Sequence, residues 1–331
     1  MKTSYSIIGS GSWATALTKI LTENGHAVCW YVRKEDTAEY IRKHKHNPNY
    51  LTDVTFNTDR LVLTTDLNEA VAHSDYLVLV IPSAFLAGEL QSLNLPLSGK
   101  IIFSAVKGIV PESGLIVGEH LNQKHQVPLH HIGVIAGPCH AEEVALERLS
   151  YLTIACTDTF QAKIFANSLS NNYIKTKISD DIIGTEYAAM LKNIYAIAAG
   201  MAHGLGYGDN FQSVLMSNAI REMQRYIERE NHMKRNITDS AYLGDLLVTG
   251  YSVFSRNRML GNMIGKGYTL KSAFMEMNMV AEGYYAVKSA YQRNRSRQIK
   301  TKTHILNTVY DVLYEKKNVR KAFDRLADNL D

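Results

Sequence analysis

The sequence contains little cysteine and no strong excess of either charge. Only three of its 331 residues are cysteines, namely Cys29, Cys139 and Cys156, and they have neither metal-ligand nor disulfide spacing. This pattern fits a reducing compartment. The formal net charge is only +4 and the basic residues are scattered, so nothing indicates a nucleic-acid partner.

Long apolar runs and targeting segments are also missing. The longest apolar stretch runs from Tyr76 to Gly88, contains Pro82 and is too short to span a bilayer. The N-terminus enters a strand pattern without a signal or transit segment. We therefore expect a cytoplasmic protein with no integral membrane segment.

The apolar content of 46% is sufficient for sizeable cores, and the length suits two domains. Short apolar runs alternate with helical patterns as far as Asp180, beyond which helical patterns dominate. The sequence therefore predicts an α/β protein. We expect a Rossmann-like doubly wound sheet that binds a dinucleotide in residues 1–180. An all-helical substrate and catalytic domain is expected in residues 181–331.

The stretch from Ser4 to Arg33 has the pattern strand, glycine turn, helix, strand. Gly9, Gly11 and Ala14 have the spacing of a dinucleotide-binding turn. Gly9 allows a tight turn, Gly11 lets the backbone approach a pyrophosphate, and Ala14 lets the helix pack closely. The pyrophosphate would then lie at the helix N-terminus. A glycine-rich turn without a ligand is the alternative.

The second strand of this unit is followed by Arg33 and Lys34. NAD-selective enzymes usually carry an acidic residue about 20 residues after the glycines, whereas here Glu35 and Asp36 come later. Because a guanidinium suits a 2′-phosphate, the pattern favours NADP. A solvated charge cluster is the alternative, and both NADP(H) and NAD(H) stay open as cofactors.

Further candidates follow later strands. Lys107 comes after the predicted strand Ile101–Ser104, at the sheet edge where such folds bind ligands; a surface lysine is the alternative. The segment Gly137–Glu143 predicts a substrate or cofactor loop. A thiol nucleophile at Cys139 is disfavoured, because sequence neighbours rarely form a working dyad. The polar segment His44–Tyr50 is interpreted as a solvated loop, and no metal site is predicted.

The helical part contains one unusual cation. The segment Ile183–Met201 has large apolar residues on one side and small ones on the other, which predicts a helix packed all round. Lys192 lies within it. A buried ammonium is costly unless it is paired, and burial lowers its pKa. Lys192 is therefore either paired with an acid from elsewhere or acts as an acid and base.

Two later features complete the pattern. Ser255, Arg256 and Asn257 offer a hydroxyl, a guanidinium and an amide, a set suited to phosphate oxygens; a polar helix start is the alternative. Gly261, Gly265 and Gly267 predict a helix with tight contacts and a turn.

Together these segments resemble the bacterial type of NAD(P)-dependent glycerol-3-phosphate dehydrogenase over essentially the whole chain. The matching segments are Gly9–Ala14, Trp30–Arg33, Lys107-Gly108, Gly137-Pro138 with Ala141-x-Glu143, Leu191–Asn193, Leu243–Leu246, Ser255–Arg258 and Val280–Gly283. Several of them are independent and far apart, so chance agreement is improbable.

The resemblance implies an oxidoreductase that reduces dihydroxyacetone phosphate reversibly to sn-glycerol 3-phosphate for phospholipid synthesis. Lys192 would donate and accept the proton. The implied cofactor-binding residues, including the glycine turn, are Gly9, Gly11, Ser12, Trp13, Ala14, Arg33, Lys34, Tyr50, Lys107, Ala141, Arg256, Val280 and Glu282. The implied substrate-binding residues are Lys107, Gly137, Cys139, Lys192, Asp245, Ser255, Arg256 and Asn257.

One departure from the family concerns Cys139, where the family usually has Ser or Thr. A thiol is a poorer hydrogen-bond partner than a hydroxyl, so a side-chain contact with the substrate would be weaker here, whereas a backbone contact would survive. Two alternatives stay open: another reductase acting on a hydroxyacid or acyl substrate, and a non-catalytic NADPH-binding protein. The partner expected is a small phosphorylated molecule, and the oligomeric state considered is a homodimer.

Overall fold

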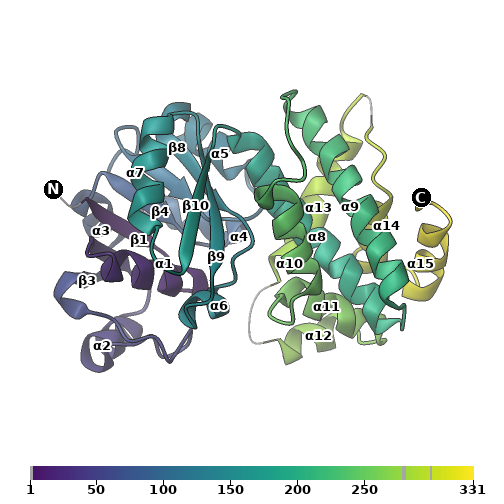
Figure 1. The fold of residues 1–331 in the computed structure, drawn as a ribbon, viewed down its shortest axis with the longest axis horizontal. Helices are drawn as coiled ribbons and strands as arrows, with labels where there is room; N and C mark the ends of the chain where they lie inside the picture. Colours follow the sequence, from purple (N-terminus) through teal and green to yellow (C-terminus); the bar gives the residue numbers. More distant parts are fainter. Residues whose placement is uncertain (1–2, 278–280, 299) are drawn as a thin grey trace. The chain divides into compact units, whose positions relative to one another are not determined.

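The computed structural model describes residues 3–277, 281–298 and 300–331. The chain forms two compact units (Figure 1). The first comprises Met1–Val106 with Leu115–Ile182, and the second comprises Lys107–Gly114 with Ile183–Asp331. The segment Lys107–Gly114 had been expected in the N-terminal domain. It belongs to the second unit, where β6 (Ile109–Val110) packs against α13 (Glu282–Arg295).

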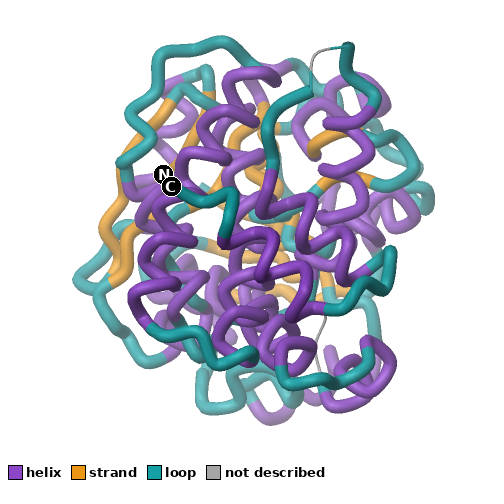
Figure 2. Tube along the Cα trace, turned by 90° about the vertical axis from the view of Figure 1, so that its right-hand side faces the viewer, coloured by secondary structure: helices purple, strands orange, loops and turns teal. Residues whose placement is uncertain are grey.

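The first unit contains an eight-stranded sheet in the order β10-β9-β8-β5-β4-β1-β2-β3. Strands are orange in Figure 2. Neighbouring strands are parallel except for β8 and β9, so the predicted Rossmann-like class is confirmed. The strands are β1 (Ser4–Ile8), β2 (Ala27–Tyr31), β3 (Leu61–Thr64), β4 (Tyr76–Leu79), β5 (Ile101–Ser104), β8 (Ile132–Ala136), β9 (Ser150–Cys156) and β10 (Ile174–Ser179).

Helices connect these strands. They are α1 (Ser12–Glu23), α2 (Glu35–His44), η1 (Thr58–Arg60), α3 (Leu67–His73), α4 (Ser83–Leu90), α5 (Val117–His125), η2 (Leu129–His131), α6 (Ala141–Ala145) and α7 (Thr159–Leu169), and a short strand β7 (Leu115–Ile116) precedes α5. The core contains Tyr5, Trp30, Phe103 and Phe165, and the last two rings stack 4.1 Å apart.

The strand order changes direction at β1. The chain passes from β1 to β2 and β3 on one side and then returns to β4 on the other side. Such a switch leaves a crevice beyond the carboxyl ends of the central strands, and α/β proteins bind ligands there. The glycine turn directly follows β1 and therefore lies at this place.

The second unit is mainly helical, as predicted. Its helices are α8 (Ile182–Gly204), α9 (Asp209–Glu230), the π-helical turn η3 (Ser240–Gly244), α10 (Asp245–Tyr251), α11 (Arg256–Gly265), α12 (Leu270–Glu276), α13, α14 (His304–Leu313) and α15 (Val319–Ala327). Every residue of α8 from Gly184 to Ala202 is buried, which confirms the prediction of a helix packed all round. No helix in the described part of the chain is long and apolar enough to cross a membrane.

Four glycines bring the backbones of α8 and α11 into direct contact. A Cβ on Gly200 would lie 2.0 Å from the carbonyl oxygen of Arg258, and one on Gly261 would lie 2.0 Å from that of Ile197. One turn further along, Gly204 and Gly265 pack against each other in the same way. The tight contacts predicted for Gly261 and Gly265 are therefore present. They fix the start of α11 relative to α8.

Because the backbones of α8 and α11 are in contact, we expect that even a methyl group added at one of these glycines destabilises the fold. Gly261→Ala should lower the free energy of unfolding by about 3 kcal/mol, because backbone atoms cannot move aside as a flexible side chain can. Gly88→Ala is the matched control, since the exposed helical Gly88 has no atom within 4 Å of its Cβ position. It should stabilise the protein by about 0.5 to 1 kcal/mol. Denaturant unfolding of both variants would contradict the prediction if Gly261→Ala were neutral.

Candidate active site

The glycine turn of the first unit is held by close packing. Gly9 has φ +133°, and a Cβ there would lie 2.5 Å from the carbonyl oxygen of Val80, just beyond β4. At Gly11, by contrast, no atom lies within 4 Å of the Cβ position. Gly11 is the N-cap of α1, and no side chain caps this helix end. Open space beside uncapped helix N–H groups fits a pyrophosphate, so this turn suits a dinucleotide.

Two residues that the sequence reasoning missed support this turn. The indole Nε1 of Trp30 donates to the carbonyl oxygen of Gly9 at 2.6 Å. The amide Nδ2 of Asn47 donates to the carbonyl oxygen of Ser10 at 3.2 Å and to Thr15 Oγ1 at 2.9 Å. The only signal for Asn47 in the sequence is that Asn-Pro often marks a turn.

The interpretation of His44–Tyr50 as a solvated loop was wrong at its centre. Asn47 is fully buried, and its Oδ1 accepts a hydrogen bond from the backbone N–H of Tyr50 at 3.3 Å. The loop is anchored because the Asn47 amide satisfies backbone groups in both the loop and the glycine turn. Tyr50, a predicted cofactor residue, is thereby tied to that turn.

The candidates for the ribose phosphate lie on the surface. Arg33 and Lys34 are exposed just before α2, with Lys34 as the helix N-cap. The carboxylate of Glu35 is hydrogen-bonded by Arg42 at 2.7 Å and by Thr65 at 2.8 Å. The Glu35 carboxylate is therefore bound by a residue of α2 and by the residue that follows β3.

The loop after β8 and the start of α6 contain three further candidates. Gly137 has φ +116°, and a Cβ there would lie 2.7 Å from the carbonyl oxygen of Tyr151, so packing against β9 requires glycine. Cys139 is half-buried, and Ala141 begins α6 and is buried. Any contact of Gly137 with a ligand would be made by its backbone.

The second unit contains a buried ion pair. Lys192 of α8 donates through Nζ to Asp245 Oδ1, and both residues are buried. Asp245 begins α10 directly after η3, and π-helical turns are frequent at functional sites. Within the described residues, Asp245 Oδ2 is buried without a hydrogen-bond partner. A ligand hydroxyl would satisfy this oxygen, whose isolation is otherwise costly.

The charges around this pair shift its acid–base behaviour. Burial lowers the pKa of Lys192 to about 8, Asp245 opposes the change, and the nearby ammonium of Lys107 adds to it. Burial also raises the pKa of the half-buried Glu282, against the charges of Lys107, Arg256 and Lys192. An ammonium with a pKa near 8 can donate or accept a proton close to neutral pH.

The predicted phosphate cluster begins α11. Ser255 Oγ caps the helix by accepting from the N–H of Arg258 at 3.3 Å, so the simpler interpretation, a polar helix start, is present. Asn257 is buried, and its Oδ1 accepts from the N–H of Gly283 at 2.9 Å. Both contacts use oxygen as acceptor, which leaves the Ser255 hydroxyl hydrogen and the Asn257 NH₂ group as donors for an anion.

The structure thus brings Lys107, Lys192, Asp245, Arg256 and Glu282 into one charged cluster in the second unit. Val280, a predicted cofactor residue, lies outside the described residues. Gly9, Gly11, Ser12, Trp13 and Ala14 lie at the turn and start of α1 in the first unit.

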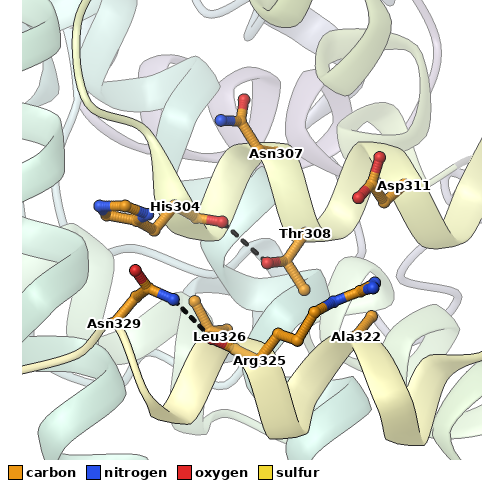
Figure 3. A pocket seen from close by; sticks show the side chains of 8 residues that line it. All are labelled: His304, Asn307, Thr308, Asp311, Ala322, Arg325, Leu326 and Asn329. Atoms are coloured by element: carbon orange, nitrogen blue, oxygen red, sulfur yellow. Dashed lines mark hydrogen bonds between the residues drawn. The ribbon is translucent and has the colours of Figure 1, made fainter.

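A separate pocket lies between α14 and α15 (Figure 3). Its volume is about 130 Å³, and none of the predicted site residues lines it. The lining residues are His304, Asn307, Thr308, Asp311, Ala322, Arg325, Leu326 and Asn329. Figure 3 shows the Thr308 hydroxyl and the Asn329 amide hydrogen-bonded to the carbonyl groups of His304 and Arg325, four residues earlier in the chain. The Thr308 hydroxyl and the Asn329 amide therefore already have partners within the chain.

Comparison with known proteins agrees with this geometry. The family pattern described as the NAD-dependent glycerol-3-phosphate dehydrogenase N-terminus matches residues 4–162, and the corresponding C-terminus pattern matches residues 181–324. A protein of Limosilactobacillus reuteri named glycerol-3-phosphate dehydrogenase, NAD(P)+, is 34% identical over 99% of this chain and 98% of its own length. A protein of Enterococcus faecalis with the same name is 34% identical over 97% of this chain and 94% of its own length.

A solved structure is similar over the same extent. The crystal structure of glycerol-3-phosphate dehydrogenase from Coxiella burnetii superposes with a TM-score of 0.90 at 26% identity, covering 98% of this chain and 99% of its own. Both units of the fold are therefore shared with this enzyme. The chain belongs to the NAD-dependent glycerol-3-phosphate dehydrogenase family.

Proposed function

We propose that the protein reduces dihydroxyacetone phosphate to sn-glycerol 3-phosphate with NADPH or NADH, and that it catalyses the reverse oxidation. The observation that carries this proposal is the buried Lys192–Asp245 pair, whose lysine pKa of about 8 suits proton transfer. Membership of the family supports the choice of reaction. The product would supply glycerol phosphate for phospholipid synthesis.

The residue roles follow from the chemistry of each group. The first unit would bind the dinucleotide, with the pyrophosphate on the N–H groups of Gly11 and Ser12. The second unit would bind the substrate, with its phosphate on Ser255, Arg256 and Asn257. The other proposed cofactor-binding residues are Gly9, Trp13, Ala14, Arg33, Lys34, Tyr50, Lys107, Ala141, Val280 and Glu282. The other proposed substrate-binding residues are Lys107, Gly137, Cys139, Lys192 and Asp245.

Proton transfer would depend on Lys192. The nicotinamide supplies a hydride to the carbonyl carbon when bound. Lys192, as ammonium, would stabilise the negative charge that develops on the carbonyl oxygen and then donate its proton there. Asp245 would hold the Lys192 amine in place through Oδ1, while Oδ2 would accept a hydrogen bond from the substrate hydroxyl. In the oxidation, neutral Lys192 would accept the proton.

We also propose a homodimer in the cytoplasm. The dimer is supported by Val253 and Phe254, whose apolar side chains are exposed, since exposed apolar groups often mark subunit interfaces. The cytoplasm is supported by the cysteines, none of which forms a disulfide among the described residues. Sedimentation at micromolar concentration would measure the mass, and a monomer would remove the dimer proposal.

The reaction is tested by the absorbance of reduced nicotinamide. Dihydroxyacetone phosphate should be reduced, whereas unphosphorylated dihydroxyacetone should react far more slowly, because it lacks the anion that the start of α11 would bind. Equal rates would contradict the phosphate assignment. Tight NADPH binding without turnover on either ketone would instead indicate a binding protein or a reductase of another substrate.

Removal of the amine should abolish proton transfer. Lys192→Met should lower kcat by about 1,000-fold while NADPH binding, measured by fluorescence, stays within a factor of two to three of the wild type, because the dinucleotide turn is intact. The uncompensated Asp245 should also destabilise the fold by about 3 to 5 kcal/mol. The double variant Lys192→Met with Asp245→Asn should recover that stability but no activity. Near-normal turnover in either variant would exclude Lys192 as the acid and base.

The pH dependence should follow the ionisation of Lys192. Oxidation needs the neutral amine, so kcat/KM should rise as the pH passes about 8, and reduction should fall over the same range. Asp245 raises the pKa of Lys192, so Asp245→Asn should move both midpoints to lower pH. Profiles measured in both directions would contradict the assignment if this variant moved the midpoints upward.

Cofactor choice should depend on Arg33. Arg33→Ser should raise the KM for NADPH by about tenfold, because one charge-assisted hydrogen bond to the 2′-phosphate is lost, and should leave the KM for NADH unchanged. Lys43→Ser, which removes an exposed cation from α2, is the matched control. An equal change in both KM values would show that Arg33 does not recognise the phosphate.

A further inference from the structure

A buried carboxylate joins the C-terminus of α9 to α13. The Glu230 side chain is only 6% exposed. Arg293 Nε lies 2.9 and 3.1 Å from its two oxygens, and Arg297 Nη2 also donates to Glu230 Oε1. Two arginines therefore share one desolvated carboxylate, an arrangement that restricts both guanidinium groups.

The two arginines differ in what else they contact. Arg293 Nη1 donates to the carbonyl oxygen of Gly114 at 3.2 Å, and its guanidinium lies 5.5 Å from the ring centre of Tyr187 on α8. Arg297 lies over Tyr226 of α9, 5.0 Å from its ring centre. Arg293 thus connects α9, α13 and α8 to the segment Lys107–Gly114.

The segment Lys107–Gly114 carries a cation at its first residue. Its first residue, Lys107, lies close enough to Lys192 to act on it electrostatically, and two ammonium groups repel each other. Asp245 of α10 and Glu282 of α13 act on this cluster as acidic groups, and Arg256 of α11 adds a third cation. At the other end of the segment, Gly114 has φ +68° and its N–H donates to Val110 at 2.9 Å, so a turn presents the carbonyl that Arg293 binds.

We propose that Arg293 is a positioning residue that holds the segment Lys107–Gly114, and with it the Lys107 ammonium, beside Lys192. The carboxylate of Glu230 fixes the Arg293 guanidinium through Nε, and Nη1 of the same guanidinium binds the carbonyl of Gly114 and so fixes the segment. β6, which belongs to this segment, also packs against α13. The segment is therefore attached to the helix that carries Arg293. This inference rests on the proposed function, since it assigns Lys107 a place in that site.

The conservative variants Arg293→Lys and Arg297→Lys separate this role from simple stabilisation. Both keep the positive charge beside Glu230, but a lysine cannot contact Glu230 and the Gly114 carbonyl together as a planar fork does. Arg297→Lys is the matched control, because Arg297 shares Glu230 and leaves Gly114 untouched. Thermal unfolding of each variant measures the common structural effect.

The first readout is the pKa of Lys192. It is measured by NMR titration of labelled lysine side chains in the full-length protein, and Lys192→Met is used to assign the signal. In Arg293→Lys the pKa should rise above the wild-type value, because Lys107 moves away and its repulsion weakens. In Arg297→Lys it should stay unchanged. This measurement does not require turnover, so it stands even if the proposed reaction fails.

The second readout is kinetic. In Arg293→Lys the KM for dihydroxyacetone phosphate should rise by about tenfold, and the pH midpoint of the oxidation should move upward, while the KM for NADPH changes little. An unchanged Lys192 pKa in Arg293→Lys, or equal shifts in both arginine variants, would overturn the positioning role. A wild-type enzyme without activity on this substrate would overturn the proposed function instead.

Discussion

The second unit depends on one buried charge. Lys192 lies in a helix that is covered on all sides, and an ammonium in such a place is tolerated only because Asp245 pairs with it. The pair joins α8 to the start of α10. Burial and the nearby Lys107 lower the pKa of Lys192 to about 8, against the opposing effect of Asp245. The same interaction therefore joins the two helices and involves the lysine to which we assign proton transfer.

Close backbone packing provides the precision that this pair requires. Gly200 and Gly261 let the backbones of α8 and α11 come into contact. This contact fixes the position of α11 relative to α8, the helix that contains Lys192. In the first unit, Gly9 plays the equivalent part by letting the end of β1 approach Val80. In both units the absence of a side chain at glycine lets two backbone segments approach closely, and this contact fixes the positions of their polar groups.

The charges of the second unit suit an anionic substrate. Three cations from separate segments of the second unit act on one cluster with two carboxylates; they are Lys107, Lys192 and Arg256. Such an excess would be unfavourable in an empty site, and a phosphate would relieve it. Arg293 contributes at a distance, because it pairs with Glu230 and also fixes the turn at Gly114.

The sequence by itself determined the fold class, the glycine turn and the anomalous lysine, because each leaves a local pattern: strand period, glycine spacing, or a charge inside an apolar helix. Tertiary structure alone decided that Asp245 is the partner of Lys192, that Asn47 anchors the glycine turn, and that β9 runs antiparallel to β8. It also placed Lys107 in the helical unit. These facts depend on which distant segments meet, and neither the periodicity nor the spacing of a single chain encodes such pairings.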